Sequence, residues 1–113
     1  MPPTTITAQA VPNAFSATGL TITESNADAA NGNDVVAEDN LILLVRNAGA
    51  DPRTFVITSV ADAVTGRTGD ISVTIAAGQF RSFRLQKFGW MNSGGKIVFT
   101  GAHADLKLAV LRL

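Results

Sequence analysis

The sequence predicts an all-β protein: a single β-sandwich of about eight short antiparallel strands, of which a jelly roll is one form. Short apolar runs are separated at regular intervals by Gly, Pro, Asn and Asp, the residues typical of turns. No window of about 11 residues carries the apolar stripe of an amphipathic helix. The chain has 113 residues, the length of one domain, and its 46% of hydrophobic residues is enough for one core. We therefore expect one domain over residues 1–113.

An extended arm is expected at the N-terminus, over residues 1–5. Pro2 and Pro3 remove two backbone donors and favour an extended chain. We expect this arm to lie on a neighbouring subunit and not on its own sandwich. Residues 4–11 alternate weakly and predict the first strand.

The next segment predicts a strand followed by a long loop. Residues 17–23 place Leu20 and Ile22 on one face and threonines on the other. Residues 25–40 are polar and rich in Ala and Asn, which predicts a loop.

A central hairpin follows. Residues 41–47 form an apolar run without alternation, which predicts a strand that is covered on both faces. Residues 48–53 are expected to form the turn, because Gly49 can adopt a positive φ and Pro52 interrupts strand pairing. Residues 54–60 are the returning strand.

The C-terminal half predicts four more strands after a loop over residues 61–69. Residues 71–75 alternate most clearly, so we expect their apolar side chains in the core and their polar ones in solvent. The buried set is Ile71, Val73 and Ile75, and the exposed set is Ser72 and Thr74. The other strands are expected over residues 80–85, 96–100 and 106–113.

Charge is scarce and unevenly distributed. Charged residues make up 16% of the chain, against about 25% in typical soluble proteins. Either a partner covers part of the surface, or Ser, Thr, Asn and Gly supply the polar surface. Five acids and no bases precede Arg46, whereas nine bases and four acids lie from Arg46 onward, giving −5 and +5. Such asymmetry favours binding to other copies of the same chain or to a surface with a pattern of charges. The alternative is that the two halves fold together and their opposite charges interleave.

Net charge is zero, which does not favour attraction to nucleic acid or to an anionic membrane. The absence of cysteine excludes disulfides and thiol catalysis. The single histidine, His103, is flanked by turn-like residues and is expected in an exposed loop. The acidic segment of residues 28–39 lacks the spacing of an EF-hand, which leaves only an irregular calcium site as an alternative to a solvated loop. We expect no enzyme, no cofactor and no metal site.

Basic and aromatic residues alternate over residues 80–91. This pattern fits a groove for single-stranded nucleic acid, an interface core or an ordinary core strand with a packed loop. Nucleic acid is the least favoured of the three. The candidate interface residues, with the N-terminal arm included, are Pro2, Pro3, Thr4, Arg81, Arg84, Lys87, Phe88, Trp90 and Met91.

Five stretches, which together span most of the chain after residue 40, carry a family resemblance. They are LLVRNAG (43–49), TFVITS (54–59), GDISVTIAAGQ (69–79), KIVFTG (96–101) and LAVLRL (108–113). In them the sequence resembles the small decoration, cement or head auxiliary proteins found beside major capsid proteins in tailed phages. Relatives often carry a Gly-Pro-Phe-like break after the Ala-Ala-Gly strand, whereas residues 83–88 of this chain contain no proline.

The resemblance implies a structural virion protein that binds the outer surface of a capsid after assembly in the host cytoplasm. It implies the major capsid protein as partner, a homo-oligomer with the trimer favoured, and no catalytic residues. A carbohydrate-binding or adhesive β-sandwich on a phage or bacterial surface is the alternative. Trp90 would favour that alternative, but the chain has one tryptophan and no tyrosine for stacking on sugars.

Overall fold

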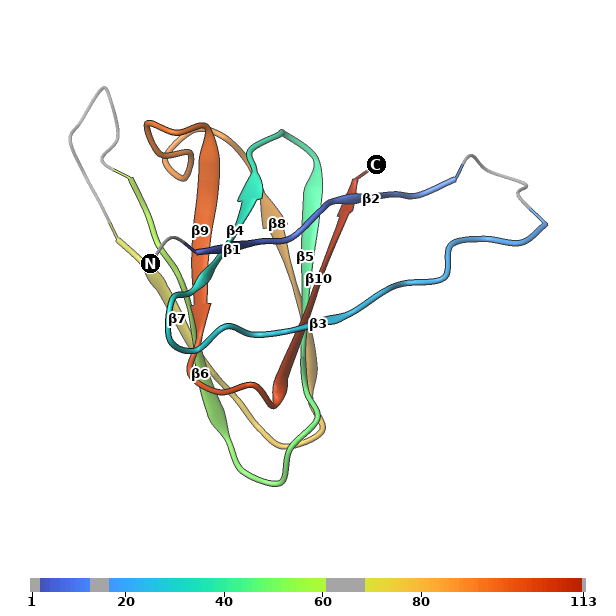
Figure 1. Ribbon diagram of the computed structural model, residues 1–113, viewed down its shortest axis with the longest axis vertical. Coiled ribbons are helices and arrows are strands. Elements are labelled where there is room, and N and C mark those ends of the chain that lie inside the picture. The colour runs from blue at the N-terminus through green and yellow to red at the C-terminus, as the bar shows by residue number, and fades with distance from the viewer. Residues whose placement is uncertain (1–2, 13–16, 61–68, 113) are drawn as a thin grey trace.

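The structure is a computed structural model that describes residues 3–12, 17–60 and 69–112. These residues form ten strands and no helix (Figure 1). The strands are β1 (Thr4–Thr5), β2 (Gln9–Ala10), β3 (Ser25–Asn26), β4 (Asn33–Val36), β5 (Leu41–Asn47), β6 (Arg53–Ile57), β7 (Ile71–Ile75), β8 (Phe80–Leu85), β9 (Lys96–Gly101) and β10 (Leu106–Arg112). The prediction of an all-β fold is confirmed. Strand orientation is mixed, however, because β1 runs parallel to β4 and β2 parallel to β10.

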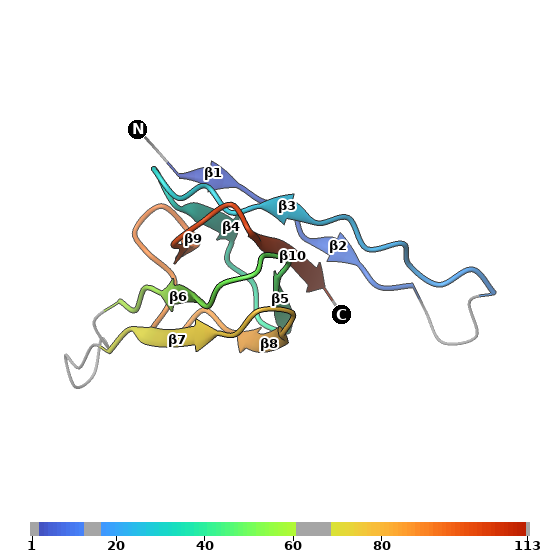
Figure 2. The same cartoon turned by 90° about the horizontal axis from the view of Figure 1, so that it is seen from below.

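The strands form two sheets that face each other as a sandwich (Figure 2). The first sheet has the order β1-β4-β9-β6-β7, and the second has the order β2-β10-β5-β8 with β3 beside β10. The N-terminal chain crosses from β1 in the first sheet to β2 in the second, and this crossing defines the closed side of the sandwich. On the opposite side, β7 and β8 are the last strands of their sheets, and we call this the open side.

The core lies between the two sheets. In β5, Leu41, Leu43 and Val45 are fully buried, while Ile42 and Leu44 on the other face are only half-buried. The prediction that both faces of this strand are covered is therefore wrong, since no third layer of described residues lies over the outer face of the second sheet. The inner face instead packs on the first sheet, where Phe55 is the central aromatic residue.

The clear alternation of β7 is only partly reflected in burial. Ile75 is fully buried and Val73 is half-buried, but Ile71 is 38% exposed. The prediction of burial is therefore wrong for Ile71. Ile71 is the first residue of β7, which is an edge strand, so it has a neighbouring strand on one side only and lies at the end of that strand, whereas Ile75 lies at the opposite end. Ser72 and Thr74 are exposed, as predicted.

The segment over residues 25–40 is not one loop, because it contains β3 and β4. Val35 of β4 is buried in the core. The preceding Asn33 is also fully buried: its Oδ1 accepts from the Asp28 N–H at 2.9 Å and its Nδ2 donates to the Thr4 carbonyl at 3.2 Å. The neighbouring Asp34 accepts from the Thr5 hydroxyl at 2.6 Å. Because these polar groups are satisfied, a strand that looks polar in sequence can enter the core.

The predicted strand over residues 17–23 is wrong. Val11–Pro12 and Ala17–Glu24 extend away from the sandwich (Figures 1 and 2), and we call these residues the projecting arm. A strand needs a pairing edge, and the free edge of β10 is already occupied by β2 and β3. The arm is attached at its base, where the Gln9 amide donates to the Thr23 carbonyl at 2.8 Å and accepts from the Thr23 N–H at 3.0 Å.

Candidate docking surface

The structure divides the candidate interface residues into two groups on opposite sides of the sandwich. Pro3 and Thr4 lie on the closed side, at β1. The remaining six lie on the open side, on β8 and in the loop that follows it: Arg81, Arg84, Lys87, Phe88, Trp90 and Met91. Pro2 lies outside the described residues. Sequence reasoning thus combined two surfaces that the fold keeps apart.

The prediction that residues 1–5 lie on a neighbouring subunit and not on their own sandwich is wrong for Thr4 and Thr5, which form β1. Thr4 and Thr5 pair in parallel with Asn33 and Asp34 of β4 in the same chain. The Thr4 hydroxyl also donates to Asp28 Oδ2 at 2.7 Å. The segment that reaches outward is therefore the projecting arm and not the N-terminus.

β8 presents an unpaired edge on the open side. Its six residues pair with β5, and no described strand pairs with its other edge. The Asn47 N–H donates to the Gln79 carbonyl at 3.0 Å and the Asn47 carbonyl accepts from the Gly78 N–H at 2.9 Å, so the backbone groups of Asn47 point toward this strand, and those of Val45, Leu43 and Leu41 follow at every second position. Since hydrogen-bonded pairs alternate along an antiparallel ladder, residues 81, 83 and 85 bond to β5. The backbone N–H groups of residues 80, 82 and 84 therefore point to the open edge.

Three exposed cations line this edge without an ion-pair partner among the described residues. Arg84 donates to the Asn40 side-chain oxygen at 2.9 Å, and Arg81 is 3.4 Å from the Gln79 side-chain oxygen. Lys87 uses its backbone N–H, which donates to Asp39 Oδ1 at 3.1 Å. None of the three side chains forms an ion pair with a described carboxylate, and the acid that lies at this end of the strand is Asp39.

Three of the other five described bases pair with acids from the first half of the sequence. Arg46 binds Glu24 through two contacts of 2.7 and 3.0 Å. The further pairs that join the two halves are Lys96 with Asp34 and Arg112 with Glu38, each at 3.9 Å. The interpretation in which the charges interleave is thus the correct one for these residues. The described bases without an ion pair are the three cations at the edge of β8 and Lys107, whose Nζ donates to the Asn26 side-chain oxygen at 2.7 Å and to the Ala104 carbonyl at 3.1 Å. Arg67 lies outside the described residues.

The aromatic residues of this segment serve two different roles. Phe83 stacks on Phe55 with ring centroids 6.0 Å apart, and Trp90 packs against the core, so these two are core residues. Phe80 and Phe88 are 56% and 58% exposed, and Met91 is exposed as well. The segment therefore combines the core and the surface roles that the sequence left open. Trp90 also lines a hollow of about 160 Å³ together with Ile57, Ile71, Arg84, Leu85 and Gln86.

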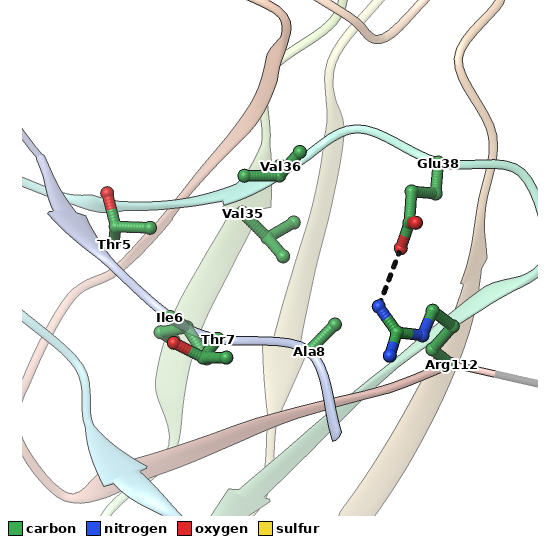
Figure 3. Close-up of a pocket in the computed structure, with 8 residues that line it drawn as sticks. All are labelled: Thr5, Ile6, Thr7, Ala8, Val35, Val36, Glu38 and Arg112. Carbon is green, nitrogen blue, oxygen red and sulfur yellow. Dashed lines mark ion pairs between the residues drawn. The ribbon is translucent and has the colours of Figure 1, made fainter. Parts of the chain in front are cut away.

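A second hollow, of about 270 Å³, lies where the N-terminal chain crosses between the sheets (Figure 3). Its titratable groups are Glu38 and Arg112, which form an ion pair at 3.9 Å. The hydroxyl of Thr5, at the same hollow, is donated to Asp34. Glu38 and Arg112 pair with each other, and the Thr5 hydroxyl already donates to Asp34, so none of these three groups is a free base or an activated nucleophile.

The groups that the sequence offered for chemistry are used within the fold. His103 lies exposed in the turn between β9 and β10, where its Nδ1 accepts from the Asp105 N–H at 3.0 Å. Hydrogen bonds from the Thr4 hydroxyl and from Asn31 hold the pKa of Asp28 below its ordinary value. No group of three or more His, Cys, Asp or Glu side chains placed to hold a metal ion occurs within residues 3–12, 17–60 and 69–112.

Comparisons of the chain with protein-family models, curated proteins and solved structures found no match. Within the part of the chain that the structure describes, no helix is long and apolar enough to cross a membrane.

Proposed function

We propose that this chain is a structural virion protein that binds the outer surface of a phage capsid and bridges neighbouring major capsid subunits. The observation that carries the proposal is the projecting arm. Its described residues are exposed except for Leu20, and Ile22 is 43% exposed. The stretches that resemble decoration proteins coincide with β5, β6, β7, β9 and β10, which build the body that carries the arm.

An extended arm of this kind is unfavourable for an isolated protein. Ordering a residue costs roughly 1–2 kcal/mol of backbone entropy, and the arm buries little apolar surface in return. A neighbouring subunit that covers Leu20 and Ile22 would offset this cost. A protein with such a contact on the assembled shell, and none on separate capsid subunits, stabilises the shell by mass action. Bridging of capsid subunits would use this reach, and the homo-oligomer, with the trimer favoured, is what the resemblance to decoration proteins implies.

The direct test is to add the purified protein to undecorated capsids and to image them by electron microscopy. We expect density on the outer surface and a higher temperature of capsid disruption. The Ile22→Ser variant should bind shells more weakly, with an unchanged melting temperature of the free protein. Thr21→Ser, at the adjacent exposed position, is the matched control. Shells without added density at saturating protein would refute the proposal.

An adhesive or carbohydrate-binding module is the second candidate, because Phe80 and Phe88 expose aromatic rings on the open side. Binding to immobilised bacterial polysaccharide that is lost in Phe88→Ala and kept in Met91→Ala would favour this function. We place it second because exposed rings without converging hydrogen-bond donors give little specificity.

A further inference from the structure

The open edge of β8 has the properties of a site for strand addition. Unpaired N–H and C=O groups along an edge strand are a template for another strand, and natural proteins usually shorten, cover or interrupt such edges. β8 is six residues long, and neither a proline nor a described strand blocks its edge. The protein therefore keeps available a row of backbone groups that most sandwiches protect.

The charge on this edge selects the occupant. Arg81 and Arg84 are three positions apart in the strand, an odd spacing, so they lie on opposite faces of the second sheet. Lys87 follows beyond the end of the strand. An added strand would thus meet a cation on each of its faces. A strand with carboxylates on both faces would neutralise charges that form no ion pair with a described carboxylate.

We propose that the open edge of β8 binds an extended, acidic segment of the capsid subunit as an additional β-strand. The identity of the partner rests on the proposed function, whereas the edge and its charge do not. Backbone hydrogen bonds to Phe80, Ser82 and Arg84 supply the strand register, and carboxylates opposite the cations supply the specificity. The exposed rings of Phe80 and Phe88, one in the strand and one just after it, add apolar contact.

A second copy of this chain fits the edge less well. Pairing of two β8 strands would gather three cations from each copy, six in all, at one interface. The projecting arm of another copy would bring no compensating charge, since residues 10–23 contain no acid and Glu24 is engaged by Arg46. An acidic segment from a different protein removes both difficulties.

The edge can be tested with the full-length protein and a synthetic peptide. The probe is acetyl-Thr-Glu-Val-Glu-Val-Glu-Thr-amide, titrated into ¹⁵N-labelled protein and followed by NMR. We expect saturable shifts at the amides of residues 80, 82 and 84. The same peptide with lysine in place of glutamate should not bind. Shifts located elsewhere, no binding, or equal binding of the lysine peptide would overturn the inference.

Two sets of variants separate the backbone from the charge. Ser82→Pro removes one outward N–H without breaking a hydrogen bond to β5 and should weaken peptide binding about tenfold, whereas Ser82→Ala should not. Arg84→Gln should weaken binding without altering the backbone, which keeps the test decisive if the proline variant does not fold. Lys107→Gln, an equal charge change on β10, is the matched control. Wild-type affinity in both Ser82→Pro and Arg84→Gln would contradict strand addition.

Binding to undecorated capsids distinguishes the two proposals. The variant for this test carries three substitutions together: Arg81→Gln, Ser82→Pro and Arg84→Gln. If it binds shells as well as the wild-type protein does, the edge of β8 is not the docking site, although the proposed function stands. If the wild-type protein does not bind shells, the proposed function fails and the peptide titration decides the edge alone. If sedimentation shows dimers of the wild-type protein and none of the Ser82→Pro variant, the edge of β8 pairs with the same edge of a second copy. That result would refute the inference.

Discussion

At the scale of single residues, the end of β5 depends on the buried side chain of Asn47. Its Nδ2 donates to the Asp51 carbonyl at 2.8 Å and to the Ile75 carbonyl at 2.9 Å, and its Oδ1 accepts from the Gly49 N–H at 3.0 Å. One amide thus closes the turn between β5 and β6 and connects it to the end of β7. The turn was predicted from Gly49 and Pro52, but the positive φ expected at Gly49 is wrong: the Asp105 side chain occupies the space that a Cβ on Gly49 would need. The connection to β7 depends on Asn47, a residue type that the sequence analysis treated only as common in turns.

Replacing Asn47 with alanine should destabilise the protein by about 1–3 kcal/mol, because the buried carbonyl of Ile75 loses its donor. Urea unfolding at neutral pH measures this loss. Asn26→Ala, at an exposed position of β3, is the control and should change stability by no more than about 0.5 kcal/mol. Equal midpoints for the two variants would show that water replaces the amide.

Glu24 and Arg46 give a prediction about pH. The hydrogen bond from Arg46 is the main cause that holds the pKa of Glu24 below its ordinary value of 4.5, while partial burial acts in the opposite direction. A carboxylate with a lowered folded pKa contributes stability that is complete above its ordinary pKa and is lost as the pH falls through the lowered value. Glu24→Gln lacks this contribution at every pH. The stability gap between wild type and Glu24→Gln in urea unfolding should therefore be larger at about pH 7 than at about pH 3; a constant gap would contradict the assignment.

At the scale of elements, position within a sheet decides what a given pattern becomes. β5 has β10 on one side and β8 on the other, and its inward side chains are fully buried. β7 has the cleaner alternation in sequence but lies at an edge, so its burial decreases from Ile75 to Ile71. Burial therefore depends on the position of the strand in its sheet and not on how clearly apolar and polar residues alternate in the sequence.

This gradient along β7 predicts the order of the losses in stability. Ile75→Ala should cost about 2–5 kcal/mol, as for a fully buried aliphatic side chain, and Val73→Ala about 1 kcal/mol because it is half-buried and loses fewer methyl groups. Ile71→Ala should cost less than Ile75→Ala, since the two side chains are the same and only their exposure differs. Thermal unfolding of the three variants measures the order. A loss for Ile71→Ala as large as that for Ile75→Ala would show that the edge position does not reduce burial.

A close contact between elements gives a second test at this scale. A Cβ atom placed on Gly101, at the end of β9, would lie 2.7 Å from the Ala27 Cβ and 3.0 Å from Leu106 Cδ1. Ala27 belongs to a segment that the sequence predicted to be a loop, and it has no flexible side chain to move aside. Gly101→Ala should therefore cost about 1–3 kcal/mol through overpacking. Gly69→Ala, with open space around the added atom, is the control for the same substitution.

At the scale of the whole molecule, the sandwich has a closed side and an open side with different surfaces. The closed side is crossed by the N-terminal chain, and the projecting arm leaves near it. The open side carries the edge of β8 and its three cations. Most of the other described bases form ion pairs within the chain, whereas Arg81, Arg84 and Lys87 form none and lie together as a basic strip, a distribution suited to oriented docking.

This distribution predicts a limited effect of salt on attachment to shells. Exposed charges mostly affect the association rate, so attachment should slow as ionic strength rises without being abolished, with apolar contacts of the arm supplying affinity. Titration of the protein onto undecorated capsids from low to high salt measures this dependence. Complete release at about 1 M salt, where the screening length is roughly 3 Å, would show that charge supplies most of the affinity. The expectation that apolar contacts supply it would then be wrong. Attachment that does not vary with salt would remove the basic strip from docking.

The predicted hairpin of residues 41–57 is wrong, because β5 and β6 lie in different sheets and do not pair with each other. The sequence by itself determined the all-β class, the two strands and the turn within residues 41–57, and the exposed position of His103. Local patterns suffice there, because alternation and turn residues act over a few neighbouring positions. Only the tertiary structure decided that residues 33–36 are a core strand and that residues 17–23 are not a strand. It also decided that the cations of β8, unlike most of the other described bases, form no ion pair with a described carboxylate. These outcomes depend on which strands occupy an edge and which distant side chains meet. Such long-range contacts leave no trace in the local order of residues.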